Sequence, residues 1–156
     1  MQIGDYEFSL ASSIDIRRNS DGSPILKYPH LEYDNKNGLQ LLDSGVGPFV
    51  LLRLSPPPPD MTGVYSVVQN GTQVMYIGRA EKSIRQRWRS GASTISPRNC
   101  FQGGQSTNCH LNIVIHQSII DGHRLELFVL LTPDFDLIET GLIAKLQPPW
   151  NKRGIR

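Results

Sequence analysis

The sequence predicts a small α/β domain with a three-stranded, mainly antiparallel sheet flanked by helices, and a β-rich elaboration in front of it. Three observations support this fold class. Two apolar runs are joined by Asn70-Gly71, a dipeptide that strongly favours a tight hairpin turn. Two helical patterns then lie before a further apolar run, at 125–131, and a third follows it. Four consecutive prolines, Pro56 to Pro59, separate these elements from an N-terminal part with few helix signals.

The N-terminal elaboration is expected to cover residues 1–59. Residues 6–10 alternate like a half-buried strand, 14–16 continue or answer it, and 49–54 form another apolar run. The prolines that follow favour a stiff, extended conformation, so we place a boundary there, before a domain at 60–156. A stiff connector inside one domain is the favoured reading. A linker between independent domains and a ligand for proline-binding modules are the alternatives.

The second part of the chain is expected to run hairpin, helix, helix, strand, helix. Ser106 or Thr107 can cap the second helix. Thr132-Pro133 opens the third, because a capping threonine before proline is a common helix start. The expected elements are strands at 63–69 and 73–79, a helix at 83–89, a helix ending at 121–122, a strand at 125–131 and a helix ending before 148.

Composition indicates a globular protein without a membrane segment. The chain has 156 residues, 38% of them hydrophobic and 19% charged, which is ordinary for a soluble domain. No apolar run approaches the length of a membrane helix and no basic-then-apolar leader begins the chain, so a cytoplasmic location is expected. The two cysteines, Cys100 and Cys109, are too few for a disulfide framework and are expected to be free thiols.

Charge is distributed unevenly along the chain. Residues 1–59 contain 5 Lys and Arg against 7 Asp and Glu, whereas residues 60–156 contain 11 against 7. The basic excess therefore falls on the second part, which suits a polyanionic partner such as a nucleic acid.

Two tripeptides suggest a function for this second part. Gly63-Val64-Tyr65 and Tyr76-Ile77-Gly78 lie on the two strands of the expected hairpin. An arginine-rich helix, a lone glutamate on a later helix, and then Pro149-Trp150-Asn151 follow in order. This arrangement resembles the GIY-YIG nuclease family over roughly residues 60–153, with valine in place of the first isoleucine. The resemblance implies an endonuclease that hydrolyses phosphodiester bonds in DNA with Mg²⁺, for which Mn²⁺ can substitute.

Tyr65 and Tyr76 are the first candidates for catalysis. Tyrosines on strands are ordinarily packing residues. The resemblance instead implies that Tyr65 accepts the proton from the attacking water and that Tyr76 supports it by hydrogen bonding. A phenol has a pKa of about 10, so it needs neighbouring cations to act as a base near neutrality.

The helix at 83–89 contains three arginines. Ile84 and Trp88 are four residues apart and should share the buried face. Arg87 flanks that face, while Arg85 and Arg89 are expected to be solvated. The resemblance implies an essential arginine just before a bulky apolar residue, which matches Arg87. A guanidinium can bind a phosphate with two hydrogen bonds.

Glu139 and Asn151 complete the candidate catalytic set. Glu139 shares a helical stripe with Leu142, Ile143 and Leu146, where a carboxylate is costly unless it is paired or binds a metal. It could balance a buried arginine; the resemblance implies that it holds Mg²⁺. The resemblance also implies that Asn151 helps to order the site, although a loop asparagine is ordinarily a turn residue.

Further residues are candidates for contact with DNA. Gly103-Gly104 could let backbone amides approach a phosphate, and the polar stretch around them carries side chains that can read base edges. An ordinary loop and helix start is the competing reading. The DNA-binding candidates are Arg79, Arg85, Arg98, Asn99, Gln105, Asn108 and Asn112.

Two features depart from simple expectation. Some members of the resembled family carry a histidine one turn after the helix arginine, where this chain has Gly91; His110 or His116 could substitute, but a lone histidine is more often structural. A zinc site made from Cys100, Cys109 and these histidines matches no common spacing.

Several functional readings stay open at this point. Besides a restriction-type, mobile-element, phage or repair nuclease, the second part could be a non-catalytic nucleic-acid-binding module that keeps the fold. Residues 1–59 could instead bind a partner that delivers the nuclease, or form a homodimer contact.

Overall fold

The computed structural model describes residues 1–33 and 38–152, which form two compact units. The first unit combines Met1–Ile14, Leu54–Arg87 and Gly122–Arg156, and the second combines Asp15–Arg53 and Trp88–Asp121. The units therefore interleave along the sequence, with boundaries after residues 14, 53, 87 and 121. Among the helices described, none is both long enough and apolar enough to cross a membrane.

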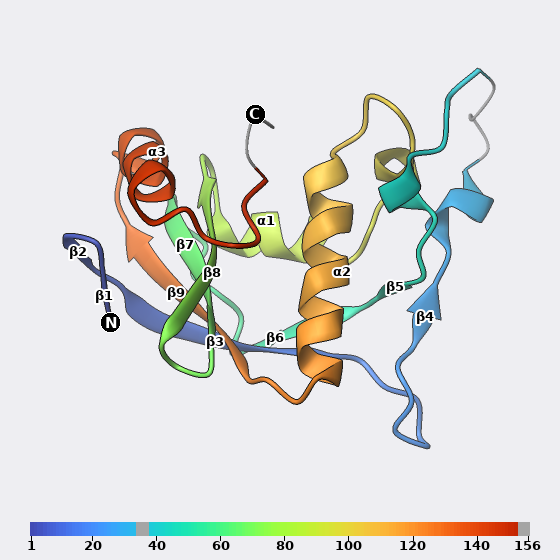
Figure 1. Cartoon of the computed structure of the whole chain (residues 1–156), viewed down its shortest axis with the longest axis horizontal. Helices are drawn as coiled ribbons and strands as arrows, with labels where there is room; N and C mark the ends of the chain where they lie inside the picture. Colours follow the sequence, from blue (N-terminus) through green and yellow to red (C-terminus); the bar gives the residue numbers. More distant parts are fainter. Residues whose placement is uncertain (34–37, 153–156) are drawn as a thin grey trace. The chain divides into compact units, whose positions relative to one another are not determined.

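An antiparallel sheet forms the centre of the first unit (Figure 1). The predicted hairpin is present as β7 (Gly63–Gln69) and β8 (Gln73–Ala80), and β9 (Leu125–Leu131) pairs with β7 on its other side. The expectation of three strands was wrong, because β3 (Ser9–Ile16) pairs with β9 and β6 (Leu52–Ser55) flanks β3. The sheet thus has five strands in the order β6-β3-β9-β7-β8, so part of the N-terminal elaboration belongs to it.

One face of this sheet packs against α3 (Phe135–Leu146). Ile138 and Leu142 of the helix join Val64, Val68 and Ile77 of the strands in one buried apolar cluster. These strand residues lie on a single face because side chains alternate along a strand. The strand order leaves β8 at the edge of the sheet.

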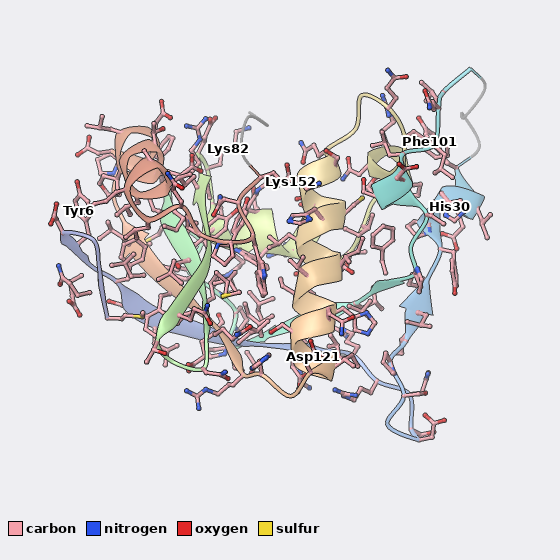
Figure 2. The ribbon with its side chains drawn as sticks, viewed as in Figure 1. Tyr6, His30, Lys82, Phe101, Asp121 and Lys152 are labelled. Atoms are coloured by element: carbon pink, nitrogen blue, oxygen red, sulfur yellow. The ribbon has the colours of Figure 1, made fainter. Side chains whose placement is uncertain are left out.

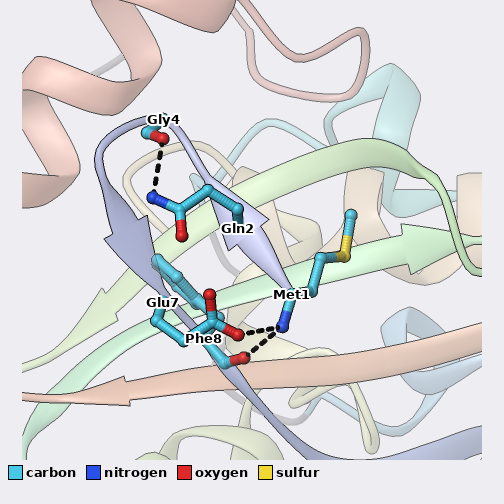
Figure 3. Close-up of polar contacts among 5 residues, drawn as sticks. All are labelled: Met1, Gln2, Gly4, Glu7 and Phe8. Carbon is cyan, nitrogen blue, oxygen red and sulfur yellow. Dashed lines mark hydrogen bonds and ion pairs between the residues drawn. The ribbon is translucent and has the colours of Figure 1, made fainter.

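The N-terminal hairpin completes this core. It consists of β1 (Gln2–Ile3) and β2 (Tyr6–Glu7), and it places Ile3 and Phe8 in the same apolar cluster. The Met1 amino group donates to Glu7 Oε1 and to Phe8 O, both at 2.8 Å, while Gln2 bonds Gly4 O (Figure 3). The expected strand 6–10 is therefore interrupted at Phe8, where the chain turns its side chain into the core.

The second unit is built around α2 (Ser106–Ile120). Phe49, Ile95, Cys100, Phe101 and Cys109 form its buried cluster, and Phe101 is labelled in Figure 2. The remaining elements are β4 (Leu26–Lys27), β5 (Phe49–Val50) and short 3₁₀ helices at Pro29–Glu32, Asp43–Gly45 and Pro97–Cys100. The expected strand at 49–54 is divided at Leu51 between β5 and β6.

Two predicted helix starts were also wrong. The N-cap of α2 is Gln105, without a side-chain cap bond, rather than Ser106 or Thr107. The helix α3 starts later than expected, at Phe135, because the Thr132 hydroxyl accepts a hydrogen bond from the Asp134 N–H at 3.1 Å and caps a turn before the helix.

Candidate active site

A one-residue bulge in β8 brings the two motif tyrosines to one face of the sheet. Near the turn, Val68 pairs with Val74; farther along, Val67 pairs with Tyr76, so Met75 is the extra residue. A regular ladder would place Tyr65 and Tyr76 on opposite faces, because a shift of one residue reverses every side chain. With the bulge, the two rings stack at a centroid distance of 6.3 Å and an interplanar angle of 28°.

Gly78 makes room for the Tyr65 ring. The two residues are cross-strand partners, and a Cβ added to Gly78 would lie 2.6 Å from the Tyr65 hydroxyl oxygen and from the adjacent ring carbon. Tyr65 is only 2% exposed, so its ring has little space into which to retreat. The glycine that ends the second motif is therefore a steric requirement of the tyrosine in the first.

The helix α1 (Ile84–Ser90) contributes Arg87 to the same place. Its guanidinium donates a hydrogen bond to the Tyr65 phenol, and its charge interacts with Tyr76 and Glu139. Ile84 is fully buried, as predicted, and Arg87 is half-buried beside it. Within one compact unit, the fold thus gathers Tyr65, Tyr76, Arg87 and Glu139.

Electrostatics couple these groups. Burial raises the pKa of the Tyr65 phenol, the positive charge and hydrogen bond of Arg87 lower it in part, and the Glu139 carboxylate raises it. The Tyr65 phenol raises the pKa of Arg87, burial opposes this, and Tyr76 and Glu139 add to the increase. The arginine therefore stays charged, and the phenol keeps its proton at neutral pH in the free protein.

Glu139 occupies the buried side of α3. It is 8% exposed; of the predicted stripe Leu142 is buried and Ile143 half-buried, whereas Leu146 is exposed. Ile138, outside the predicted stripe, is also buried on this side. In the described part of the chain, no three His, Cys, Asp or Glu side chains gather into a potential metal site. A single protein carboxylate suits Mg²⁺, which takes few protein ligands and keeps several waters, better than a closed zinc site, which takes four.

Asn151 supports the edge strand. Its Oδ1 accepts from Ile77 N and its Nδ2 donates to Ile77 O, both at 2.9 Å, and the neighbouring Trp150 N donates to Met75 O at 2.9 Å. The segment after α3 therefore bonds to β8 at the bulge and between the motif residues Tyr76 and Gly78. With both amide atoms bound to backbone, Asn151 is placed to orient the strand rather than to touch a substrate.

The other arginines of β8 and α1 have distinct positions. Arg79 forms ion pairs with Asp136 and, at 3.6 Å, with Glu81. Arg85 is half-buried rather than fully solvated as expected, and its Nε donates to Pro58 O at 2.8 Å. Arg89 at the far end of α1 is exposed, in agreement with the prediction.

The remaining DNA-contact candidates lie in the second unit, where several bond to their own loop. Asn112 is 1% exposed and its amide bonds Val50 N and O and Ala92 O, so this side chain serves the fold and does not face a base. Arg98 donates to Gln102 O at 3.0 Å, and Asn99 Oδ1 accepts from Gln105 N at 3.0 Å.

Further internal bonds in this loop favour the competing structural reading. Asn108, which is also buried, donates from Nδ2 to Gln105 Oε1 at 2.9 Å. A Cβ on Gly104 would lie 2.5 Å from Arg98 O, so this glycine is needed for close packing of the loop.

The histidine and cysteine candidates also belong to the second unit. Cys100 and Cys109 are buried thiols of its apolar cluster and are not joined in a disulfide. His110 and His116 both lie on α2. Burial, together with the charge of Arg18, lowers the pKa of His116.

For a site that cleaves DNA, as the motif resemblance implies, substituting Gly78 by alanine is expected to lower the cleavage rate by about 10²-fold, because a displacement of about 1 Å in a reacting group has that effect. The new methyl group must displace the buried Tyr65 ring or the strand, with a loss of about 1–3 kcal/mol of unfolding free energy. Cleavage kinetics and thermal unfolding measure the two effects. Gly141→Ala on α3 is the matched control, since nothing lies within 4 Å of its added Cβ. Equal activity of the two variants would contradict the steric role of Gly78.

Comparison with known proteins finds similarity of fold. No protein-family model matches the chain, and no curated protein sequence matches it. Among solved structures, a glutamate-to-alanine mutant of bacteriophage T4 EndoII matches with a TM-score of 0.51 and 20% sequence identity. The match covers 73% of this chain and 87% of the EndoII chain.

Proposed function

We propose that this chain is a Mg²⁺-dependent endonuclease that hydrolyses phosphodiester bonds in DNA. The observation that carries the proposal is the meeting of Tyr65, Tyr76, Arg87 and Glu139 around one sheet edge, with a hydrogen bond between Arg87 and Tyr65. The motif resemblance supports the same reading. So does the name of the structural neighbour, EndoII, which suggests a nuclease.

Arg87 is proposed to bind and stabilise the scissile phosphate. Its high pKa keeps the guanidinium charged, and half-burial beside the tyrosines holds it in a restricted orientation. A planar guanidinium can form two parallel hydrogen bonds with phosphate oxygens, which fixes the phosphate and offsets the charge that develops as the bond breaks.

Tyr65 is proposed to take the proton from the attacking water. The water oxygen forms the new bond to phosphorus, the bond to the leaving oxygen breaks, and the leaving oxygen is protonated by solvent. The phenol must first lose its own proton, which burial opposes and Arg87 favours. Tyr76, stacked on it, limits the orientations of the ring.

Glu139 is the residue proposed to hold the divalent cation, either Mg²⁺ or Mn²⁺. The cation would act as a Lewis acid on the phosphate, polarising it toward attack. Glu139 also faces the charge of Arg87, so the carboxylate has a second favourable partner when no cation is bound. Asn151 is proposed to keep β8, and with it Tyr76, in position.

DNA binding is proposed to involve exposed cations of the first unit. Lys82, just before α1, and Lys152, just after Asn151, are both exposed and are labelled in Figure 2. Arg79, although ion-paired with Asp136, keeps a third of its side chain exposed. Such groups contact phosphates without reading sequence, so binding is expected to weaken as salt rises.

The test is incubation of the full chain with supercoiled plasmid and with single-stranded DNA, in Mg²⁺, in Mn²⁺ and in EDTA, followed by mapping of the ends. Nicked or linear products that need the cation are expected. The same preparation of Glu139→Gln serves as the control for contaminating nucleases. DNA binding without cleavage under every condition would overturn the enzyme proposal and favour the non-catalytic binding module.

Substituting Tyr65 by phenylalanine is expected to lower the cleavage rate by about 10²-fold or more, the usual scale of a general base. Stability should change only by about 1 kcal/mol, since a single hydrogen bond is lost. The wild-type rate should rise with pH through the neutral range, because the pKa of Tyr65 is raised and the phenolate fraction grows up to that pKa. Rates at saturating Mg²⁺ between pH 6 and 9, for wild type and Tyr65→Phe, measure both effects.

Tyr76→Phe is the companion variant and should lose less activity, because its ring supports Tyr65 without taking the proton. A near-normal rate for Tyr65→Phe, or a pH profile unchanged by the substitution, would exclude Tyr65 as the base.

A further inference from the structure

The proline-rich segment in front of β7 is bonded along its length to the start of α1. Six hydrogen bonds join residues 58–62 to residues 81–85. The Thr62 hydroxyl contributes two of them as a bifurcated bond, its single proton shared between Glu81 O and Lys82 O. The other four are Arg85 Nε to Pro58 O, Arg85 N to Pro59 O, Ile84 N to Met61 O and the Ser83 hydroxyl to Asp60 Oδ1.

These bonds provide hydrogen-bond acceptors for the N–H groups at the start of the short helix α1. The first N–H groups of a helix have no partner within it. In α1 the N–H groups of Ile84 and Arg85 bond to carbonyls of residues 61 and 59, and that of Gln86 bonds to the Ser83 hydroxyl at 3.2 Å. A helix of seven residues is too short to be stable alone, so its place depends on such contacts.

Asp60 is linked to the candidate active site through Ser83, whose hydroxyl and backbone carbonyl make separate hydrogen bonds. The Asp60 carboxylate accepts the Ser83 hydroxyl proton, and Ser83 O accepts the Arg87 N–H at 3.0 Å. The Arg87 guanidinium then donates to the Tyr65 phenol. Residues 58–62 also run directly into β7, the strand that carries Tyr65. Both partners of the Arg87–Tyr65 bond are thus fixed to the same short segment.

We infer that residues 58–62 act as a strap that sets Arg87 against Tyr65, and that Asp60 is a positioning residue for the nuclease reaction. The inference rests on the proposed function, because it assigns what orients the arginine that binds the phosphate. Stiffness suits the role: prolines at 58 and 59 hold their carbonyls in place without donors of their own. Asp60 acts only through Ser83 and Arg87 and contacts no substrate.

The test compares Asp60→Ala with two variants that should behave like wild type. Asp60→Ala should lower kcat about 10- to 100-fold, as expected for a misplaced reacting group, with KM and DNA affinity within about twofold. Asp60→Asn keeps an oxygen that accepts the Ser83 proton and should restore the rate. Asp5→Ala removes another exposed carboxylate of the same unit, 3.7 Å from Lys145, and should change nothing. Thermal unfolding confirms that each variant is folded.

A double substitution separates positioning from simple stabilisation. If Asp60 acts through Arg87, then Asp60→Ala should cause no further loss of kcat in an Arg87→Ala background. Additive losses in the double variant, or a wild-type kcat for Asp60→Ala alone, would overturn the inference.

A readout without catalysis keeps this inference separate from the nuclease proposal. With 3-fluorotyrosine at position 65, the ¹⁹F resonance reports the contact of the phenol with Arg87. Asp60→Ala should move this resonance in the same direction as Arg87→Ala, whereas Asp60→Asn and Asp5→Ala should leave it in place. An unmoved resonance in Asp60→Ala overturns the inference that the strap positions Arg87. A moved resonance in a protein that cleaves no DNA supports the positioning role of the strap and overturns the proposed nuclease function instead.

Discussion

Substituting Glu139 by glutamine is expected to abolish DNA cleavage while leaving the fold and DNA binding intact. Glutamine keeps the shape of the side chain but removes the anionic oxygen that would hold the cation. A metal ion supplies several kcal/mol of transition-state stabilisation, so the rate should fall by about 10³-fold or more. Plasmid cleavage across a Mg²⁺ titration measures the loss, and gel-shift binding in Ca²⁺ or EDTA measures what is retained.

Asp136→Asn is the matched control for this experiment. Asp136 lies one turn before Glu139 on α3, with its side chain exposed and ion-paired with Arg79. The same chemical change there should cost little, because exposed ion pairs contribute about 0–1 kcal/mol. If Glu139→Gln cleaves at the wild-type rate in saturating Mg²⁺, Glu139 is not the metal ligand. Its burial would then be explained by the alternative, in which the Glu139 carboxylate only balances the charge of Arg87.

The hairpin and the strand after it were predictable from local sequence. The expected bounds of β7 and β9 agree with those observed, because Asn70-Gly71 defines one turn and continuous apolar runs define the strands. The five-stranded sheet was not predictable in the same way. Pairing of β3 with β9 joins residues more than 100 positions apart, and nothing in either segment alone specifies its partner.

The bulge at Met75 shows that the sequence motifs alone do not determine the geometry of the site. The motifs suggested that two phenols reach one site, yet a regular hairpin from Asn70-Gly71 would separate them across the sheet. The extra residue is stabilised by a distant segment, through Trp150 N to Met75 O. Gly78 could have been found from the sequence, since a glycine paired with an aromatic residue is typical of close approach. That deduction still needs the bulged register.

Polar composition was a poor guide to the stretch at 96–112. Asparagine and glutamine suit the reading of bases, but they also satisfy buried backbone, and sequence alone does not separate the two uses. Asn112 bonds three backbone atoms and Asn108 bonds Gln105, so at least these side chains serve the fold. The role of Asp60 was not predicted, because the residue only follows a run of prolines in the sequence and its hydrogen-bond partner, Ser83, lies 23 positions away.

Substituting Arg87 by alanine is expected to have the second-largest effect, a loss of about 10³-fold in kcat, comparable to the loss of a group that stabilises transition-state charge. Arg89→Ala is the matched control, because Arg89 has the same chemistry on the same helix but is exposed. Its loss should weaken DNA binding slightly and uniformly, with kcat unchanged. Arg85 is not a suitable control, since its Nε bonds the strap at Pro58 O.

Arg87→Lys and the behaviour of Tyr65 identify the mechanism of that loss. Lysine keeps the charge but cannot form two parallel hydrogen bonds, so Arg87→Lys should recover binding more than kcat. Removing the guanidinium also removes the interactions that lower the pKa of Tyr65. The rise of rate with pH should therefore extend to higher pH in Arg87→Ala than in wild type. Equal losses for Arg87→Ala and Arg89→Ala, both following DNA affinity, would mean that the helix offers a diffuse basic surface and that Arg87 does not act on the reacting phosphate.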